Sequence, residues 1–197
     1  MKRRGLLIDR DGTICEEVGY LDRVEALKLL PGSAKAIRRA NEAGFQAVVI
    51  TNQSGVGRGL LDESRLADIH DGMRALLAEE GARIDGIYYC PHHPAAALDR
   101  YRRECECRKP RPGMLLRAGD EMGIDLKASY VIGDRCRDVE AARAVGATDV
   151  LVLTGYGSRE VEYHSGRERP RPTHVAKDLG AAVDWILNRE AQRAADD

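Results

Sequence analysis

The sequence predicts an α/β fold in which helices cover both faces of a parallel β-sheet. Short apolar runs typical of strands alternate with longer segments typical of helices. Two runs, Val48-Val49-Ile50 and Leu151-Val152-Leu153, are apolar at every position, as expected of strands buried on both faces. The length of 197 residues suits one domain. We expect this domain to span residues 1–190, followed by a frayed tail over residues 191–197.

The individual elements are predicted from apolar patterning and from signals at their ends. Asp62 is a candidate N-cap, and Gly44 and Gly146 end the helices that precede them. Residues 156–171 are rich in charge and glycine and predict a loop. The predicted strands are Gly5–Asp9, Gln46–Thr51, Ile84–Cys90, Ser129–Gly133 and Asp149–Thr154, and the predicted helices are Ser33–Ala43, Asp62–Glu80, Pro112–Met122, Asp138–Val145 and Leu179–Arg189.

The composition excludes several classes of protein. Lysine and arginine number 31 against 32 acidic residues, so the chain has no overall positive field that would attract nucleic acid. No apolar run approaches the roughly 20 residues that span a bilayer, and the first one ends at Asp9, too early for a signal peptide. We therefore expect a cytoplasmic protein without disulfides. Nothing in the sequence resembles a dimerisation stripe, so a monomer is expected.

Polar residues follow four of the predicted strands at the point where each strand ends. Ligands bind at the carboxyl ends of the strands in folds of this class, so we expect these residues to meet at one rim. Asn52, Gln53 and Ser54 are expected to contact the substrate there. The polar segments are Asp9 with Asp11, Thr51-Asn52-Gln53-Ser54, Cys90-Pro91-His92-His93 and Gly133-Asp134-Arg135.

Two carboxylates, Asp9 and Asp11, follow the first strand. One carboxylate can act as a nucleophile and form a covalent intermediate. The second can protonate a leaving oxygen and later accept a proton from water. Because like charges so close repel, a divalent cation such as Mg²⁺ is the natural way to keep a carboxylate ionised there. Asp9 alone fits a turn or cap equally well, but a third acid at the same rim, Asp134, favours chemistry.

A second informative stretch, residues 90–107, concentrates metal-ligating side chains. Cys90 is followed by two histidines, His92 and His93, and Cys105 and Cys107 are two residues apart. Thiolates with one imidazole form the usual four-ligand set of structural zinc sites. The alternative is a group of buried or incidental thiols, which does not explain this concentration. The stretch therefore predicts a zinc loop, with either histidine as the fourth ligand.

Four motifs in order resemble the haloacid-dehalogenase-like phosphatases, over residues 5 to about 155. The Asp-x-Asp pattern alone is weak evidence, but four ordered motifs at strand ends are specific. The resemblance implies a Rossmann-like parallel sheet. The motifs are Asp9-Arg10-Asp11-Gly12-Thr13, Thr51, Lys109, and Gly133-Asp134 with Asp138.

The resemblance implies a mechanism that these residues can support. Asp9 attacks phosphorus, and Asp11 protonates the departing alcohol and then activates water. Mg²⁺ is held by Asp9, Asp134 and the main-chain carbonyl of Asp11. Thr51 and Lys109 hold the oxygens of the transferring phosphoryl group. Positioning and charge neutralisation of this kind are what phosphoryl transfer requires.

The zinc loop narrows the resemblance to one branch of the family. Three segments, Thr51–Gly55, Cys90–Pro94 and Cys107–Pro110, are similar to the branch of D-glycero-D-manno-heptose 1,7-bisphosphate 7-phosphatases and histidinol-phosphate phosphatases. The branch implies a capless enzyme whose zinc loop lies at the active-site rim. It also implies His92 over His93 as the ligand that joins the three cysteines around a structural Zn²⁺.

The choice of substrate within this branch depends on charge. A sugar bisphosphate needs cations away from the Mg²⁺ site, and Arg108 and Arg135, with Arg58 further out, are candidates. Histidinol phosphate instead needs acidic or aromatic neighbours, which Glu17 and Tyr20 can provide, although both can equally bind sugar hydroxyls. The long zinc loop resembles the heptose enzymes, so a phosphorylated sugar is the favoured substrate.

Two nucleic-acid functions are the alternatives. The zinc loop carries several arginines that could contact phosphates, and some DNA 3′-phosphatases share the first motif. The neutral charge of the chain and the small number of aromatic side chains near the loop argue against both. The arginines concerned are Arg100, Arg102, Arg103, Arg108 and Arg111.

Overall fold

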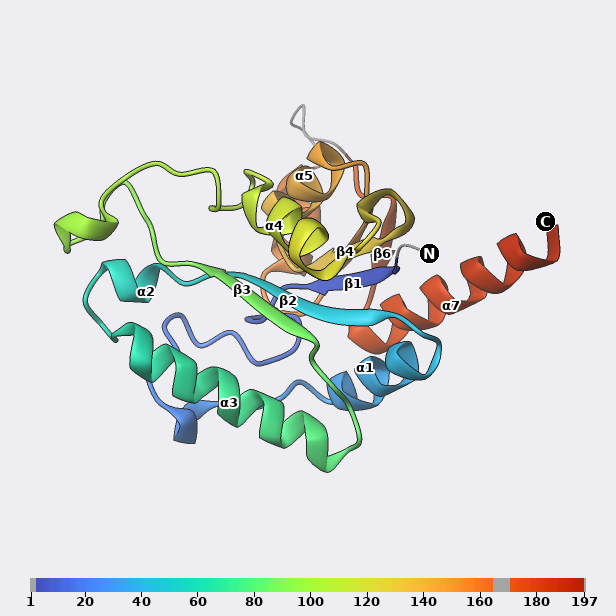
Figure 1. The fold of residues 1–197 in the computed structure, drawn as a ribbon, viewed down its shortest axis with the longest axis horizontal. Helices are drawn as coiled ribbons and strands as arrows, with labels where there is room; N and C mark the ends of the chain where they lie inside the picture. Colours follow the sequence, from blue (N-terminus) through green and yellow to red (C-terminus); the bar gives the residue numbers. More distant parts are fainter. Residues whose placement is uncertain (1–2, 165–170, 197) are drawn as a thin grey trace.

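A computed structural model describes residues 3–164 and 171–196 of the chain. Six parallel strands form one sheet in the order β3-β2-β1-β4-β5-β6 (Figure 1). The chain builds the sheet outward from β1 to β3, and then returns to the other side of β1 to place β4. The strands are β1 (Gly5–Ile8), β2 (Gln46–Asn52), β3 (Gly86–Cys90), β4 (Tyr130–Gly133), β5 (Thr148–Val152) and β6 (His174–Ala176).

Helices cover both faces of the sheet, as predicted (Figure 1). Leu6 and Ile8 of β1 are buried on the face covered by α1, α3 and α7, and Leu7 is buried on the face covered by α4 and α5. This alternation follows from the two-residue period of a strand. The helices are α1 (Ser33–Glu42), α2 (Ser54–Gly57), α3 (Glu63–Glu79), α4 (Gly113–Met122), α5 (Cys136–Ala144), α6 (Gly157–His164) and α7 (Leu179–Asp196), with short 3-10 helices η1 (Val24–Ala26), η2 (Asp99–Tyr101) and η3 (Leu126–Ala128).

The α/β class and the five predicted strands are confirmed, and the structure differs from the predicted elements at three places in the last third of the chain. The short strand β6 was not predicted. Helix α6 occupies part of the expected loop 156–171, of which residues 165–170 lie outside the described part. Helix α7 continues to Asp196, so the expected frayed tail is helical up to that residue, and only residue 197 lies outside the description. Figure 1 shows this end of α7 projecting away from the sheet.

The central position of β1 determines where the site forms. All four residues of β1 are buried between β2 and β4. The Asp9 N–H still donates to the carbonyl of Ile132 in β4 at 2.9 Å, so Asp9 is aligned with the sheet. Directly afterwards the N–H groups of Ile14 and Cys15 both donate to the Arg10 carbonyl at 2.9 Å, which turns the chain. Asp9 and the turn are therefore fixed at the carboxyl end of the sheet.

The connections between strands carry single helices and loops. In the described ranges they form no separate folded unit above the carboxyl ends of the strands. One long excursion there is the predicted zinc loop, which leaves β3, passes through η2 and returns to α4. No helix in these ranges has both the length and the apolarity to cross a membrane.

Candidate active site

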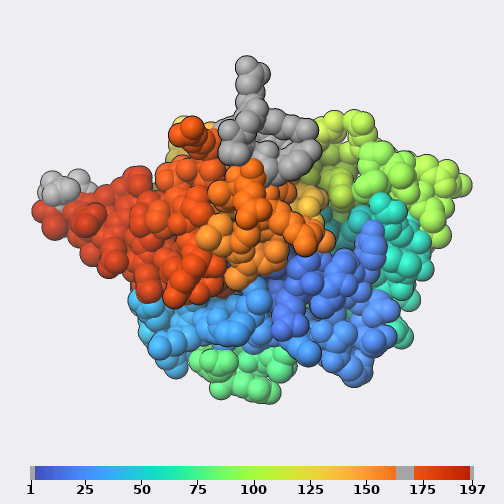
Figure 2. All heavy atoms as spheres, turned by 180° about the vertical axis from the view of Figure 1, so that it is seen from behind, coloured from blue at the N-terminus to red at the C-terminus, as the bar shows by residue number. Residues whose placement is uncertain are grey.

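A polar cavity of about 320 Å³ lies at the carboxyl ends of the strands. It brings together all the predicted catalytic, Mg²⁺-binding and substrate-binding residues. The segment after β1 and the segment around α6 lie against each other beside it, in blue and orange in Figure 2. The predicted residues that line the cavity are Asp9, Asp11, Glu17, Tyr20, Thr51, Asn52, Gln53, Ser54, Arg108, Lys109, Asp134 and Arg135.

Lys109 is buried at the bottom of the cavity between two carboxylates. Its Nζ lies 2.6 Å from Asp138 Oδ1 and 3.1 Å from Asp9 Oδ1, and it donates to the carbonyl of Ile50 at 2.7 Å. Burial alone would lower the pKa of Lys109, but the carboxylates of Asp138 and Asp9 raise it above its ordinary value. The ammonium is therefore a fixed positive charge beside Asp9, and its three N–H groups are all engaged.

Asp134 is the second buried carboxylate beside Asp9. Only 1% of the residue is exposed, and its Oδ2 accepts a hydrogen bond from the Tyr156 N–H at 2.8 Å. A Cβ added at Gly12 or Gly155 would lie within 2.3 Å of that oxygen, and both glycines have positive φ. Burial, followed by the charge of Asp9, raises the pKa of Asp134 to about 8. The two glycines thus allow close packing around a carboxylate that is poorly stabilised by protein groups.

Asp9, Asp134 and Asp138 form a cluster whose carboxylate oxygens lie within 4.8 Å of one another. Lys109 neutralises one of these charges through its contact with Asp138. Asp9 and Asp134 remain as a pair of carboxylates that repel each other in a buried setting. Carboxylate oxygens that open onto a polar cavity are the donor set that Mg²⁺ prefers. The residues present therefore fit a divalent cation between Asp9 and Asp134.

Asp11 accepts three hydrogen bonds from neighbouring side chains. Arg10 donates from Nε to Oδ1 at 3.0 Å and from Nη2 to Oδ2 at 2.9 Å. Gln53 donates to Asp11 Oδ2 and to Thr51 Oγ1, both at 2.8 Å. Thr51 Oγ1 thus acts as an acceptor here, and its own hydroxyl proton remains available to a ligand. Gln53 thus links Asp11 to Thr51, near the carboxyl end of β2.

Asn52 and Ser54, both predicted to contact the substrate, differ in their surroundings. The Asn52 side chain forms a two-way clamp on the main chain of Lys109, since Nδ2 donates to its carbonyl and Oδ1 accepts from its N–H, each at 3.1 Å. This clamp positions Lys109 and occupies the amide of Asn52. Ser54 begins α2 at the cavity wall, where its side chain is partly exposed.

The predicted zinc ligands converge at the base of the loop. The three sulfurs of Cys90, Cys105 and Cys107 lie 3.2 to 3.5 Å apart, and His92 Nδ1 lies 3.3 Å from the sulfur of Cys107. All four ligand atoms lie within 4.8 Å of one another. Tetrahedral zinc with Zn–S bonds of about 2.3 Å places sulfurs about 3.8 Å apart, so a small expansion accommodates the ion. His93 instead lines the active-site cavity, which favours His92 as the fourth ligand.

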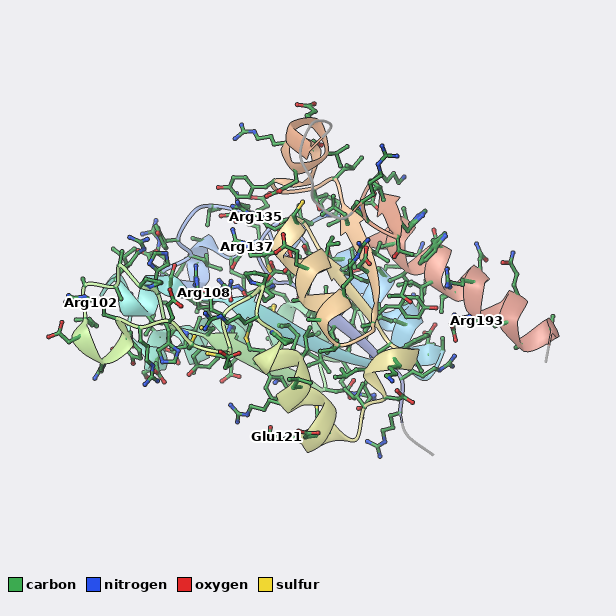
Figure 3. All side chains as sticks on the ribbon, turned by 90° about the horizontal axis from the view of Figure 1, so that it is seen from above. Arg102, Arg108, Glu121, Arg135, Arg137 and Arg193 are labelled. Atoms are coloured by element: carbon green, nitrogen blue, oxygen red, sulfur yellow. The ribbon has the colours of Figure 1, made fainter. Side chains whose placement is uncertain are left out.

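Three arginines line the cavity together with the carboxylates. Arg108 directly follows the zinc loop, and Arg135 and Arg137 lie at the start of α5. Figure 3 shows Arg108, Arg135 and Arg137 on the same side of the molecule, with Arg102 further out on the loop. Arg108 Nη1 donates to the carbonyl of His92 at 3.1 Å. The Arg135 guanidinium carbon lies 3.3 Å from the centre of the Tyr156 ring, so that ring fixes the guanidinium beside the cavity.

The two residues predicted to surround the rest of the substrate lie at the outer wall of the cavity. Burial raises the pKa of Glu17, whose Oε1 accepts a hydrogen bond from the Gly19 N–H at 2.6 Å. Tyr20 is 47% exposed, and the Arg58 guanidinium carbon lies 5.9 Å from the centre of its ring. Both side chains line the cavity away from the cluster of acids.

Sequence reasoning did not assign functional roles to three residues that the structure brings to the cavity. Arg10 lies between the two predicted catalytic acids, but nothing in the sequence shows that it is buried. Arg137 follows Asp134 by three residues and could have been inferred from the first turn of α5. Tyr156 lies just before α6, in the segment predicted as a loop.

Comparisons with known proteins agree with the geometry. A family model described as "HAD-hyrolase-like" matches residues 106–182. D-glycero-beta-D-manno-heptose-1,7-bisphosphate 7-phosphatase of Yersinia pestis is 40% identical over 93% of this chain and 89% of its own length. D-glycero-D-manno-heptose-1,7-bisphosphate 7-phosphatase of Thermosynechococcus vestitus is 38% identical over 98% of this chain and all of its own length.

A solved structure is also similar over nearly the whole chain. The crystal structure of D,D-heptose 1,7-bisphosphate phosphatase from B. bronchiseptica, complexed with magnesium and phosphate, matches with a TM-score of 0.84 and 35% identity. The match covers 94% of this chain and 99% of that one. The similarity in fold therefore extends over nearly the whole of both chains.

Proposed function

Because this chain belongs to the haloacid-dehalogenase-like phosphatases, we propose that it removes the 7-phosphate of D-glycero-D-manno-heptose 1,7-bisphosphate in a Mg²⁺-dependent reaction. The observation that carries this proposal is the placement of Asp9. Its carboxylate lies beside the buried Lys109 ammonium and the Asp134 carboxylate, at the bottom of a cavity that arginines overlook. The relatives that match over most of the chain bear the name of this activity.

The chemistry assigned to the two acids is double displacement. The Asp9 carboxylate forms a bond to phosphorus while the bond from phosphorus to the sugar oxygen breaks, and Asp11 gives its proton to that oxygen. A water molecule then attacks the phosphorus of the aspartyl phosphate and passes its proton to Asp11, which frees phosphate and restores Asp9. Thr51 and Lys109 stabilise the phosphoryl oxygens during both steps.

The metal assigned to this reaction is Mg²⁺, held by the carboxylates of Asp9 and Asp134. By family analogy the main-chain carbonyl of Asp11 is a further ligand. When bound, the ion supplies positive charge next to the transferring phosphoryl group. Gly12 and Gly155 pack against Asp134, where any larger residue would collide with the carboxylate that would hold the ion.

Substrate recognition is assigned to the arginines above the acids. A second phosphate on the sugar would meet Arg108, Arg135 and Arg137, with Arg58 at the outer wall. The amine and imidazole of histidinol phosphate would meet the same positive charges, which disfavours that substrate. The test is release of phosphate from both anomers of the heptose bisphosphate, from histidinol phosphate and from other sugar phosphates, compared by kcat/KM. A higher value for histidinol phosphate would overturn the assignment.

A nucleic-acid function for the zinc loop is not supported by its contacts. Arg102 donates to the carbonyls of Ala96 and Ala97, and Arg111 pairs with Glu104 and Glu106. These arginines hold the loop together and do not form a row directed at a phosphate backbone. A phosphorylated sugar therefore remains the favoured partner.

Treatment with a chelator should distinguish the proposed Mg²⁺ site from the proposed zinc site. We expect EDTA to abolish phosphate release and added Mg²⁺ to restore it, because the proposed site has only two carboxylate side chains as ligands and adjoins the cavity. About one zinc per chain should survive purification, because three thiolates and an imidazole form a closed site. Elemental analysis on protein prepared without chelator measures this, and finding no zinc would refute the zinc loop.

Removing one zinc ligand should affect catalysis indirectly. Cys107→Ser is expected to release zinc and to loosen Arg108 and Lys109, which follow it directly in the chain. The kcat should then fall for every substrate, and the preference between substrates should weaken. The sheet does not depend on this loop, so the variant should keep its far-UV circular dichroism. Loss of zinc with full activity and selectivity would show that the loop has no part in catalysis.

A further inference from the structure

Arg10 has a charged side chain that is almost completely shielded from solvent. Only 1% of the residue is exposed, and it is the largest side chain among those that are fully buried in the described ranges. Its only ion-pair partner there is Asp11, which it binds through two parallel hydrogen bonds. A buried guanidinium is tolerated only where an anion compensates it, and the planar fork matches a carboxylate.

Two titratable groups near the Arg10 charge, His70 and Cys15, are neutral. Burial, followed by the charges of Arg10 and Arg74, lowers the pKa of His70 on α3 to about 3. Burial raises the pKa of Cys15 to about 12. The third guanidinium nitrogen, Nη1, is buried and has no acceptor among the described residues. Asp11 therefore has no close competitor for the guanidinium in this part of the core.

The hydrogen bonds leave Asp11 with one open position. An ionised carboxylate offers about four acceptor sites, two on each oxygen. Arg10 uses one site on each oxygen, and Gln53 uses the second site on Oδ2. One site on Oδ1 remains, and the Asp11 side chain is 20% exposed where it lines the active-site cavity.

We propose that Arg10 is the positioning residue of Asp11, fixing its carboxylate so that all proton transfer runs through the open site on Oδ1. This role rests on the proposed phosphatase function. In the first step the proton leaves Oδ1 for the sugar oxygen as the bond from that oxygen to phosphorus breaks. In the second step Oδ1 takes the proton of the water that attacks the aspartyl phosphate. Arg10 touches neither phosphorus nor water, so it acts only through Asp11.

The test uses two leaving groups with the Arg10→Leu variant of the full-length, Mg²⁺-loaded protein. With 4-nitrophenyl phosphate the leaving group departs without a proton, so formation of the aspartyl phosphate should stay fast while its hydrolysis slows. Stopped-flow absorbance should then show a burst of about one nitrophenolate per chain before a slow steady state. With the heptose bisphosphate, kcat should fall by about 10- to 100-fold and no burst of released sugar should appear.

Four further variants make the result specific to Arg10. Arg143→Leu breaks an ion pair with the buried carboxylate of Asp149, away from the cavity, and should show no burst and no dependence on the leaving group. Asp11→Asn should give the same burst as Arg10→Leu, and the double variant should be no slower than Asp11→Asn alone. If Arg10→Leu does not fold, Arg10→Lys keeps the charge but not the fork and serves for the same measurements.

The outcomes separate this inference from the function on which it rests. Equal losses on both substrates without a burst, unchanged kinetics, or additive losses in the double variant would overturn the role of Arg10. Failure of the wild-type protein to release phosphate from any monoester, or full activity of Asp9→Asn, would overturn the phosphatase itself. A burst in Arg10→Leu that is absent from Arg143→Leu supports the inference.

Discussion

Asp9→Asn is expected to lower kcat by about 10⁴-fold or more, the order of magnitude found when a covalent nucleophile is removed. Asparagine keeps the shape of the side chain, and its Oδ1 can still accept from the Arg10 N–H and from Lys109, which are the contacts of Asp9 in the structure. The variant loses the nucleophile and one charged ligand of the proposed Mg²⁺ site, so saturating Mg²⁺ is used in the assay. Steady-state phosphate release, with the heptose bisphosphate and with 4-nitrophenyl phosphate, measures the effect. Both substrates should lose activity, because both need Asp9 to attack phosphorus.

The same variant should fold at least as well as the wild-type protein when Mg²⁺ is absent. Burial, followed by the charge of Asp9, raises the pKa of Asp134 to about 8, so in the folded protein without metal both carboxyl groups can ionise only against their mutual repulsion. Replacing one by a neutral amide removes that repulsion. Thermal unfolding in EDTA checks this and acts as the control for activity. A variant that unfolds at the same temperature yet retains a tenth of the activity would show that Asp9 is not the nucleophile.

The sequence was sufficient to predict five of the six strands because these five are largely apolar. Runs such as Val48-Val49-Ile50 can be buried only between two helical layers, and β2 indeed has five consecutive buried residues. The strand β6 was missed because it has three residues, of which only Ala176 is buried. Helix α6 was missed because its sequence, GSREVEYH, is mostly polar and follows a glycine-rich turn. Neither has the periodic pattern on which the other predictions rested.

The site was predictable to the extent that its residues follow strand ends. Asp9, Thr51 and Asp134 reach one cavity because parallel strands end on the same side of the sheet. The clamp of Asn52 on the Lys109 main chain could not be predicted, since it joins two residues 57 positions apart. The burial of Arg10 could not be predicted either, because the sequence Asp-Arg-Asp does not indicate whether the arginine is exposed to solvent or buried.

Lys109→Met is expected to lower kcat by about 10²- to 10³-fold on every substrate, the range for loss of one group that stabilises developing charge. In the structure all three N–H groups of Lys109 are engaged, and the longest contact is the one to Asp9. When Asp9 bonds to phosphorus, its negative charge moves to the phosphoryl oxygens. The Lys109 ammonium already lies beside Asp9, so we expect it to stabilise the charge on those oxygens. The loss should be the same for 4-nitrophenyl phosphate and for the heptose bisphosphate, because it does not depend on the leaving group.

This variant should also be less stable, and increasingly so at higher pH. Asp138 is buried, and without Lys109 its carboxylate has lost the cation that opposes the effect of burial on its pKa. Breaking a buried pair of this kind costs about 3–5 kcal/mol of unfolding free energy. Burial raises the pKa of Asp138 in the folded protein, whereas in the unfolded chain it is about 3.9. Stability should therefore decrease as the pH rises above that value, up to the raised folded-state pKa.

A second substitution separates the two roles of Lys109. Lys109→Met combined with Asp138→Asn replaces the lone buried carboxylate by a neutral amide. Urea unfolding between pH 5 and pH 8 should show that much of the lost stability returns and that its pH dependence weakens, while kcat stays low because Asp9 still lacks its cation. If the double variant regained activity along with stability, Lys109 would serve only to hold Asp138 in the core. Stability that stays low in the double variant would instead mean that the destabilisation arises elsewhere, at the contact with the Ile50 carbonyl.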